Sequence, residues 1–130
     1  MPAPFCYNGF CGKQYGLTGG SEMEPRVETA YLLDFYGALL TPKRREMLRM
    51  RYEEDMSLSE IGAQMGVSRQ AVSDGMVAAR KKLEEYEAKL GLVRRYLAIT
   101  AEAGACLQAL DADDRAGARR HLQNILQIER

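Results

Sequence analysis

The stretch SLSEIGAQMGVSRQAVSD at residues 57–74 constrains the fold more than any other part of the chain. Ser57 and Glu60 form the S-x-x-E pattern that opens a helix, since each side chain can bond the other residue's backbone N–H. Gly66 follows at the length of a short helix and can take the left-handed conformation that ends one. Ser68 then supplies the cap of a second helix. The stretch therefore predicts a helix-turn-helix.

Small and apolar residues occupy the positions where two such helices would cross. Gly62 lies four residues before Gly66, and we expect it to be small because the second helix passes over it. The alternative is a tight helical corner with no binding role, which needs the same small residues and caps. The apolar residues expected to fill the joint are Ile61, Met65, Val67 and Val72.

Helical periodicity also runs upstream of this stretch. Apolar residues spaced three and four apart run from Pro25 to residue 40 and predict one helix. Thr41 and Pro42 then repeat the start signal, with threonine as the N-cap and proline in the first turn. The second of these helices should fray near Asp55. The expected inward positions of the two helices are Val27, Tyr31, Leu32, Phe35, Leu39, Leu40, Met47, Leu48, Arg51 and Tyr52.

Downstream, the helix that begins after Ser68 keeps an apolar face as far as Gly91. Two more helices are expected. One covers about residues 92–109, and the other runs to the end of the chain from a cap at Asp111 or Asp113. No segment has the alternation typical of a strand. The expected fold class is therefore all-α, a helix-turn-helix with a C-terminal helical extension.

Residues 1–22 differ in composition from the rest of the chain. They are rich in glycine and their aromatic residues follow no helical or strand period, so we expect a flexible tail. They lack the basic region and the apolar core of a secretory signal. Met23 stands directly before the patterned sequence, and one hypothesis is that translation begins there. The expected division is a tail at 1–22, a helix-turn-helix domain at 23–91 and a C-terminal helical hairpin at 92–130.

The chain has no net charge, with 18 basic and 18 acidic residues. Phosphate contacts supply most of the sequence-independent affinity for nucleic acid, so a dedicated binder usually has a basic excess. Basic and acidic residues alternate here instead of forming blocks, and we expect any DNA binding to be weak and salt-sensitive. No apolar run approaches the roughly 20 residues of a membrane span. Three cysteines, an odd count, suit a reducing cytoplasm.

Outward positions at the start of the second helix carry side chains that can read DNA. Arginine can clamp guanine and glutamine can clamp adenine in the major groove. We therefore expect Arg69 and Gln70 to read bases, with Ser68 and Ser73 supporting them. Asp74 would be repelled by phosphates unless it accepts from a cytosine amino group. The residues expected to contact phosphates are Arg44, Arg45 and Lys81.

Other chemistry has little support in the sequence. Cys6 and Cys11 resemble half of a zinc site, but the single histidine is His121 and Cys106 lies on an apolar helical face. One histidine and no glycine-rich phosphate loop give no basis for catalysis. The sequence thus predicts no metal, no cofactor and no enzyme activity. The aromatic residues expected in the core rather than stacked on bases are Tyr31, Phe35, Tyr36 and Tyr52.

Four pieces between residues 32 and 92 are distinctive: LLDFYGALLTPK, SLSEIG, VSRQAVSD and LEEYEAKLGL. Together they resemble the YlxM family of bacterial proteins. The resemblance implies an all-helical fold like sigma-factor region 4, a regulatory role and Gram-positive-type bacteria. Genes of this family typically lie beside those of the signal recognition particle, which implies a role in that pathway. The 22-residue leader departs from the family pattern, and so does Gly62, where members often have alanine.

Two functions remain open at this point. The first is a cytoplasmic DNA-binding regulator whose second helix lies in the major groove. The second is an interaction module that kept the fold but binds the protein or the RNA of the signal recognition particle. The neutral charge favours the second function, whereas the Ser-Arg-Gln sequence at residues 68–70 favours the first.

An apolar seam along the long helix predicts a homodimer formed through that helix and the C-terminal helices. Its members recur at alternating spacings of four and three, the pattern that pairs helices. One isolated helix-turn-helix also contacts little DNA. In the alternative, the seam packs against the chain's own helix at residues 112–128. The seam residues are Ala79, Leu83, Tyr86, Leu90, Val93 and Leu97.

Overall fold

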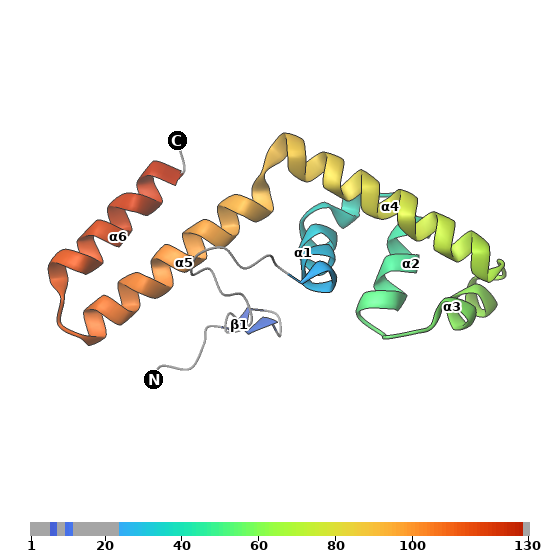
Figure 1. The fold of residues 1–130 in the computed structure, drawn as a ribbon, viewed down its shortest axis with the longest axis horizontal. Helices are drawn as coiled ribbons and strands as arrows, with labels where there is room; N and C mark the ends of the chain where they lie inside the picture. The colour runs from blue at the N-terminus through green and yellow to red at the C-terminus, as the bar shows by residue number, and fades with distance from the viewer. Residues whose placement is uncertain (1–5, 8–9, 12–23, 129–130) are drawn as a thin grey trace.

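The structure is a computed structural model that describes residues 6–7, 10–11 and 24–128. Figure 1 shows its main part as a series of helices, which confirms the all-α expectation. A short 3-10 segment, η2 (Gly37–Leu39), follows the first helix. The α-helices are α1 (Pro25–Tyr36), α2 (Pro42–Tyr52), α3 (Leu58–Met65), α4 (Arg69–Leu90), α5 (Leu92–Asp111) and α6 (Arg115–Ile128).

Two very short strands precede the helices. β1 (Cys6–Tyr7) pairs antiparallel with β2 (Phe10–Cys11), and Cys6 stands opposite Cys11 in the register. The sequence shows no strand pattern here, because a ladder two residues long is too short for alternation to be visible. The other residues of the expected tail at 1–22 lie outside the described residues.

Side-chain caps start α3 and α4 where the sequence predicts them. The Ser57 hydroxyl accepts a hydrogen bond from the Glu60 N–H, and the Glu60 carboxylate accepts one from the Ser57 N–H over 2.7 Å. The Ser68 hydroxyl accepts from the Ala71 N–H over 3.0 Å. These bonds satisfy N–H groups that have no partner inside their own helix. Both expected caps are confirmed.

Two glycines make the turn between α3 and α4 possible. Gly66 has a φ of 70°, the left-handed region that favours glycine. A Cβ on Gly62 would lie 2.7 Å from the carbonyl oxygen of Val67 and 3.4 Å from the Arg69 nitrogen. The chain entering α4 therefore passes directly over Gly62, as expected, and a side chain at that position requires the turn to open.

The core has two parts that meet on α4. The larger part lies between α1, α4 and the start of α5 and includes Leu48 of α2, and the smaller part lies between α2, α3 and α4. Met76 packs against both. Fully buried side chains of the larger part include Leu32, Tyr36, Leu48 and Leu83, and those of the smaller part include Ile61 and Val72.

The expected inward face of the first two helices is partly wrong. Phe35 and Leu39 are exposed, whereas Leu33 and Tyr36 are buried. The α-helical period stops at Tyr36, because η2 has a tighter turn and shifts the residues after it. Arg51, which was expected to face inward on α2, is exposed.

Two helix caps differ from the expected ones. Thr41 holds the N-cap position of α2, but its side chain makes no capping hydrogen bond to a described residue. Asp111 is the last residue of α5, and Asp113 has a φ of 55°, so neither caps α6. Asp114 accepts a hydrogen bond from the Gly117 N–H over 2.9 Å. The left-handed Asp113 must first turn the chain, which moves the cap one residue further on.

The apolar seam at residues 79–97 is covered inside the chain. Leu90 is exposed, because Gly91 ends α4 with a φ of 64° and breaks the seam. Packing of this seam against a second copy or against the helix at 112–128 is therefore wrong, since α1 covers it, and the homodimer itself stays a prediction. The members that share a buried cluster with residues of α1 are Ala79, Leu83, Val93 and Leu97.

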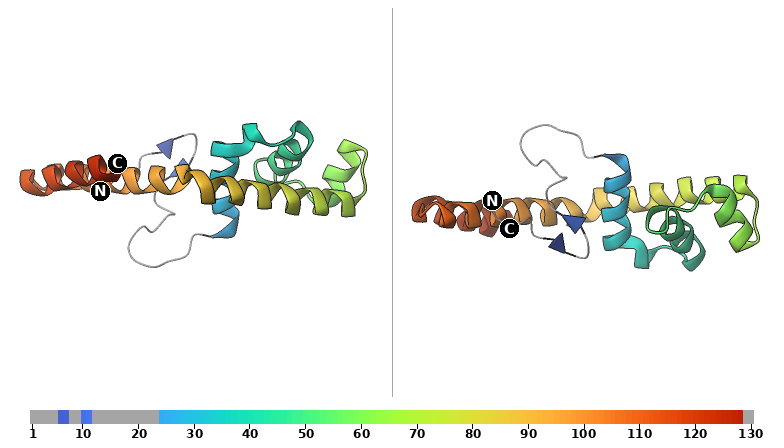
Figure 2. Two further views of the ribbon diagram at one scale, coloured as in Figure 1. Left: turned by 90° about the horizontal axis from the view of Figure 1, so that it is seen from above. Right: turned by 90° about the horizontal axis from the view of Figure 1, so that it is seen from below.

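The last two helices form an antiparallel hairpin that extends away from α1, α2 and α3 (Figures 1 and 2). Its inner seam consists of small side chains, with Cys106, Gly117 and Ala118 buried. Further along the seam, the Glu102 Oε2 and the His121 Nδ1 lie 2.7 Å apart. That contact holds the pKa of the Glu102 carboxyl below its usual range. The start of α5 packs against α1 and so joins the hairpin to the rest of the molecule.

Candidate nucleic-acid interface

The first two turns of α4 hold the residues expected to read bases. Val72 is fully buried against α2 and α3, which fixes the rotation of α4 about its axis. Ser73 is half-buried and the other expected residues are exposed. The structure therefore brings five of the expected site residues together. We call this set the reading edge: Ser68, Arg69, Gln70, Ser73 and Asp74.

Gln70 and Asp74 are linked within the reading edge. The Gln70 Nε2 donates a hydrogen bond to the Asp74 Oδ1 over 2.9 Å, one turn along the helix. A glutamine amide nitrogen has two protons, and bidentate contact with adenine uses one of them together with the carbonyl oxygen. Asp74 can therefore hold Gln70 in place and leave its adenine-reading groups free.

Val77 extends the exposed side of α4 by one turn. Its side chain is 68% exposed, although valine is apolar. Val77 is not among the site residues predicted from the sequence, but a signal was present, since Val77 falls outside the buried series of Val72, Ala79 and Leu83. An apolar side chain next to base-reading groups suits contact with a thymine methyl group.

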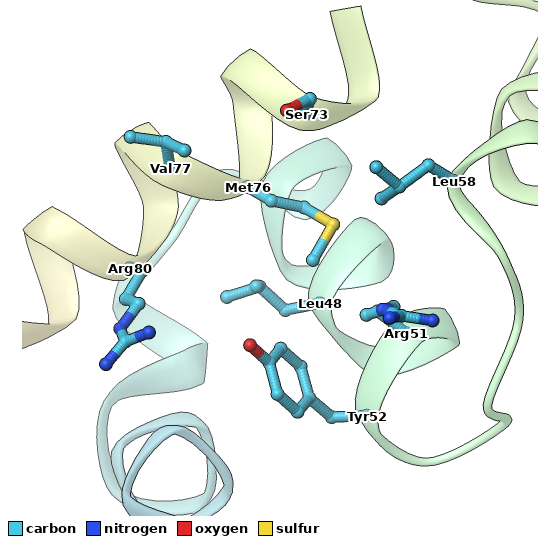
Figure 3. A pocket seen from close by; sticks show the side chains of 8 residues that line it. All are labelled: Leu48, Arg51, Tyr52, Leu58, Ser73, Met76, Val77 and Arg80. Carbon is cyan, nitrogen blue, oxygen red and sulfur yellow. The ribbon is translucent and has the colours of Figure 1, made fainter. Parts of the chain in front are cut away.

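Arg51 lies closer to the reading edge than the sequence indicates. Figure 3 shows a surface hollow between α2 and α4, lined by Arg51 on one side and Arg80 on the other. Ser73 and Val77 line the same hollow. The Arg51 Nη1 donates to the Met56 carbonyl oxygen over 3.0 Å, which holds the guanidinium at the loop before α3. Its position in the helical period suggested burial, but a long cationic side chain can cover apolar surface and keep its head in water.

The three residues expected to contact phosphates lie on other turns than the reading edge. Arg44 and Arg45 are exposed in the first turn of α2. Lys81 is exposed on α4, and at ~1.5 Å per residue it lies about 18 Å along the axis from Arg69. These three residues therefore do not form one cluster with the reading edge.

Several other basic side chains of α2 and α4 are paired with carboxylates. Arg49 binds Glu46 over 2.6 Å and also binds Glu54, and the bond from Arg49 lowers the pKa of the Glu46 carboxyl. Arg80 binds Glu84 over 3.0 Å. In contrast, seven basic residues of α2 and α4 have no ion pair with any described residue, so the zero net charge of the whole chain does not describe the charge of this surface. They are Lys43, Arg44, Arg45, Arg51, Arg69, Lys81 and Lys89.

The described part of the chain holds neither a cluster of metal ligands nor a helix that could span a membrane. No three potential metal ligands lie together there. The side chains of Cys6 and Cys11 are not among those described. No helix in the same part combines the length and the apolar character that a membrane span requires.

A family model described as "Putative helix-turn-helix protein, YlxM / p13 like" (UPF0122) matches residues 23–102. This chain belongs to that family. The match includes the reading edge, Arg51 and the first half of α5, and it confirms the resemblance seen in the sequence. The UPF0122 family is a helix-turn-helix family and not an enzyme family.

Individual UPF0122 proteins are similar to this chain over different lengths. One from Geobacillus kaustophilus is 50% identical over 74 residues, which are 57% of this chain and 67% of that protein. One from Caldanaerobacter subterraneus is 52% identical over 65 residues, 50% of this chain and 56% of that protein. One from Symbiobacterium thermophilum is 43% identical over 93 residues, which are 72% of this chain and 87% of that protein. The chain thus spans about two thirds or less of the first two relatives.

Proposed function

We propose that this protein is a DNA-binding regulator that places α4 in the major groove. The observation that carries the proposal is the exposed reading edge with Arg51 beside it, a basic side chain that has no carboxylate partner among the described residues. A helix-turn-helix docks in this way, with the first residues of its second helix on base edges. Since bacterial DNA lies in the cytoplasm, the proposal also assigns the protein to that compartment.

Each residue of the site has a role in this proposal. Arg69 clamps guanine, and Gln70, held by Asp74, reads adenine. Val77 contacts a thymine methyl group. Ser68 caps α4 and supports the edge together with Ser73. The basic residues that contact phosphates are Arg51, Arg44, Arg45 and Lys81.

The proposal is tested by measuring which contacts carry sequence information. A preferred site is first selected from random duplexes with the purified protein at ~50 mM salt, because phosphate contacts weaken steeply as salt rises. Arg69→Ala should weaken binding to that site by ~1–3 kcal/mol and relax the preference at one base pair. Lys81→Ala should weaken binding to all sequences alike. Arg120→Ala, which removes one exposed positive charge from α6, is the matched control.

The second candidate is an interaction module of the signal recognition particle, which the zero net charge favours. The same variants distinguish the two functions when they are also titrated against purified particle. Wild-type protein that binds no DNA at ~50 mM salt, together with equal binding of the particle by wild type, Arg69→Ala and Lys81→Ala, would overturn the DNA proposal and support the second.

We also propose that the protein acts as a homodimer. A single helix-turn-helix unit buries little DNA surface, and two-fold dimers of such units bind paired half-sites. Because α1 covers the seam at residues 79–97, the proposed dimer requires a different surface.

A further inference from the structure

In the α5–α6 hairpin, small apolar residues are buried and large apolar residues are exposed, which is the reverse of the usual arrangement. The side chains buried between the two helices are small, with Cys106 and Ala118 at the centre. Four leucines are instead between 53% and 67% exposed. Two helices that folded only against each other would bury their large apolar residues, because burial stabilises in proportion to apolar area. We call these four residues the leucine face: Leu107, Leu110, Leu122 and Leu126.

The leucine face lies on one side of the hairpin. Leu110 follows the inward-facing Cys106 by four positions, and Leu122 follows the inward-facing Ala118 by four positions. Two antiparallel helices that face each other are related by a two-fold axis perpendicular to both, so equal offsets from the inward residue project to the same side. The same count places Leu107 and Leu126 further around on that side, together with the exposed Arg115 and Arg119 of α6.

The opposite side of the hairpin carries small and polar side chains in place of leucines, since the same count places Ala101, Ala105 and Ala109 of α5 there. The helical period places exposed amide and basic side chains there, and Asn124 on this side bonds Glu102. An apolar patch set against a polar side marks an interaction surface rather than a scattered exposure of single residues. The polar residues are Gln108, Arg120, Asn124 and Gln127.

We infer that the leucine face packs against the leucine face of a second copy of this chain. Two hairpins paired in this way form a four-helix bundle whose core is made of leucines from both copies. A face of this kind is complementary to itself, as a two-fold interface requires. This inference deepens the homodimer put forward under the proposed function and assigns its surface.

Charge along the hairpin favours an antiparallel arrangement of the two copies. The base of the hairpin carries Arg94 and Arg95, both exposed. The turn at its tip carries Asp111, Asp113 and Asp114, also exposed. The twenty residues of α5 separate base and tip by about 30 Å at ~1.5 Å per residue. Antiparallel pairing brings the acidic tip of each copy beside the basic base of the other, whereas parallel pairing sets like charges together.

The inference is tested by the mass of the full-length protein in solution without DNA, so that its outcome does not depend on DNA binding. Sedimentation equilibrium of the wild type at micromolar concentration should give twice the 14.6 kDa of one chain. The double variant Leu107→Gln/Leu122→Gln should have a dissociation constant raised at least a hundredfold and should sediment as one chain. Leu39→Gln, an exposed leucine on η2, is the matched control and should remain a dimer.

Two further measurements keep the result interpretable. Circular dichroism of the double variant should show the helix content of the wild type, so that loss of the dimer is separated from loss of the fold. Arg95→Glu should weaken the dimer, and the added change Asp111→Lys should restore part of it.

A wild-type mass of one chain would overturn the inference and point to cover from within the chain, such as residues 1–22. A dimer unchanged in the double variant would overturn it as well.

Discussion

The phenol of Tyr36 donates a hydrogen bond to the carboxylate of Glu87 over 2.5 Å, and this contact joins α1 to the end of α4. The same carboxylate accepts hydrogen bonds from the N–H groups of Val93 and Arg94, each over 3.1 Å. The Tyr36 oxygen accepts one from the Leu92 N–H over 3.0 Å. The first N–H groups of a helix have no partner within it. Two side chains from other helices therefore cap α5.

Tyr36→Phe should lower the free energy of unfolding by about 1–3 kcal/mol, because it removes a buried hydrogen bond to a charged group and the acceptor of a backbone N–H. Urea unfolding followed by circular dichroism measures the change. Tyr52→Phe is the matched control, since the half-buried Tyr52 phenol makes no hydrogen bond to another described residue. Equal losses in the two variants would contradict the capping role.

Alkaline pH should weaken the same contact. Burial, and then the hydrogen bond to Glu87, raise the pKa of the Tyr36 phenol above its ordinary value of 10.0. The folded state therefore holds this proton more tightly than the unfolded state. The resulting stability is complete below pH 10.0 and is lost as pH rises through the higher folded-state pKa. The stability difference between wild type and Tyr36→Phe should narrow above pH 10.0, as unfolding measured across that range would show. A constant difference would be evidence against the assignment.

Asp74→Ala should change DNA affinity and DNA specificity in opposite directions. Removing a unit charge near a phosphate is worth about 1 kcal/mol in water, so binding to unrelated sequences should tighten a few-fold. Gln70 loses its partner, and the preference for adenine should fall by up to about tenfold. Fluorescence anisotropy with the selected and a scrambled duplex gives both values. Glu28→Ala, at an exposed carboxylate on α1, is the control. A variant that keeps its full preference for adenine would show that Asp74 does not position Gln70.

Ser57→Ala should lower the free energy of unfolding by ~1 kcal/mol, the usual loss for a helix cap. The capping box holds two hydrogen bonds, and the variant removes the one accepted by the serine hydroxyl. Ser59→Ala changes an exposed serine inside α3 and should have little effect. Thermal unfolding of the two variants side by side decides the matter. If Ser57→Ala is no less stable than Ser59→Ala, the hydrogen bond accepted by the Ser57 hydroxyl does not contribute to the stability of the fold.

The helix-turn-helix could be predicted from the sequence because its signals are local. Ser57 and Glu60 cap each other within one turn, and Gly66 ends the helix that they open. The cap of α5 could not be predicted in this way, since its partners Tyr36 and Glu87 lie 51 positions apart and neither residue has a local signature. Only the folded core brings them together.

In the candidate site, too, only the features with local signals could be predicted from the sequence. The side chains at the start of α4 follow from the position of the turn, so the sequence could place them on one edge. Arg51 joins the hollow beside Ser73 only because α2 packs against α4, whereas the period within α2 alone indicated that Arg51 is buried. Packing between helices, and not propensity within one helix, decides which cations stand beside the reading edge.

The unbroken length of α4 has a mechanical consequence. Its 22 residues run from the reading edge to the turn that holds Glu87, about 33 Å at ~1.5 Å per residue. Sharp bends within a helix occur at a proline, a pair of Gly and Ser, a bulge or an inserted group. The interior of α4 has no proline, and α4 is one uninterrupted α-helix through Ser73 and Gly75. A torque applied to the C-terminal hairpin is therefore not absorbed by a flexible linker, because the Tyr36 and Glu87 contacts transmit it to α4. The helix then acts as a rigid lever, and tilting the hairpin at one end swings the reading edge at the other.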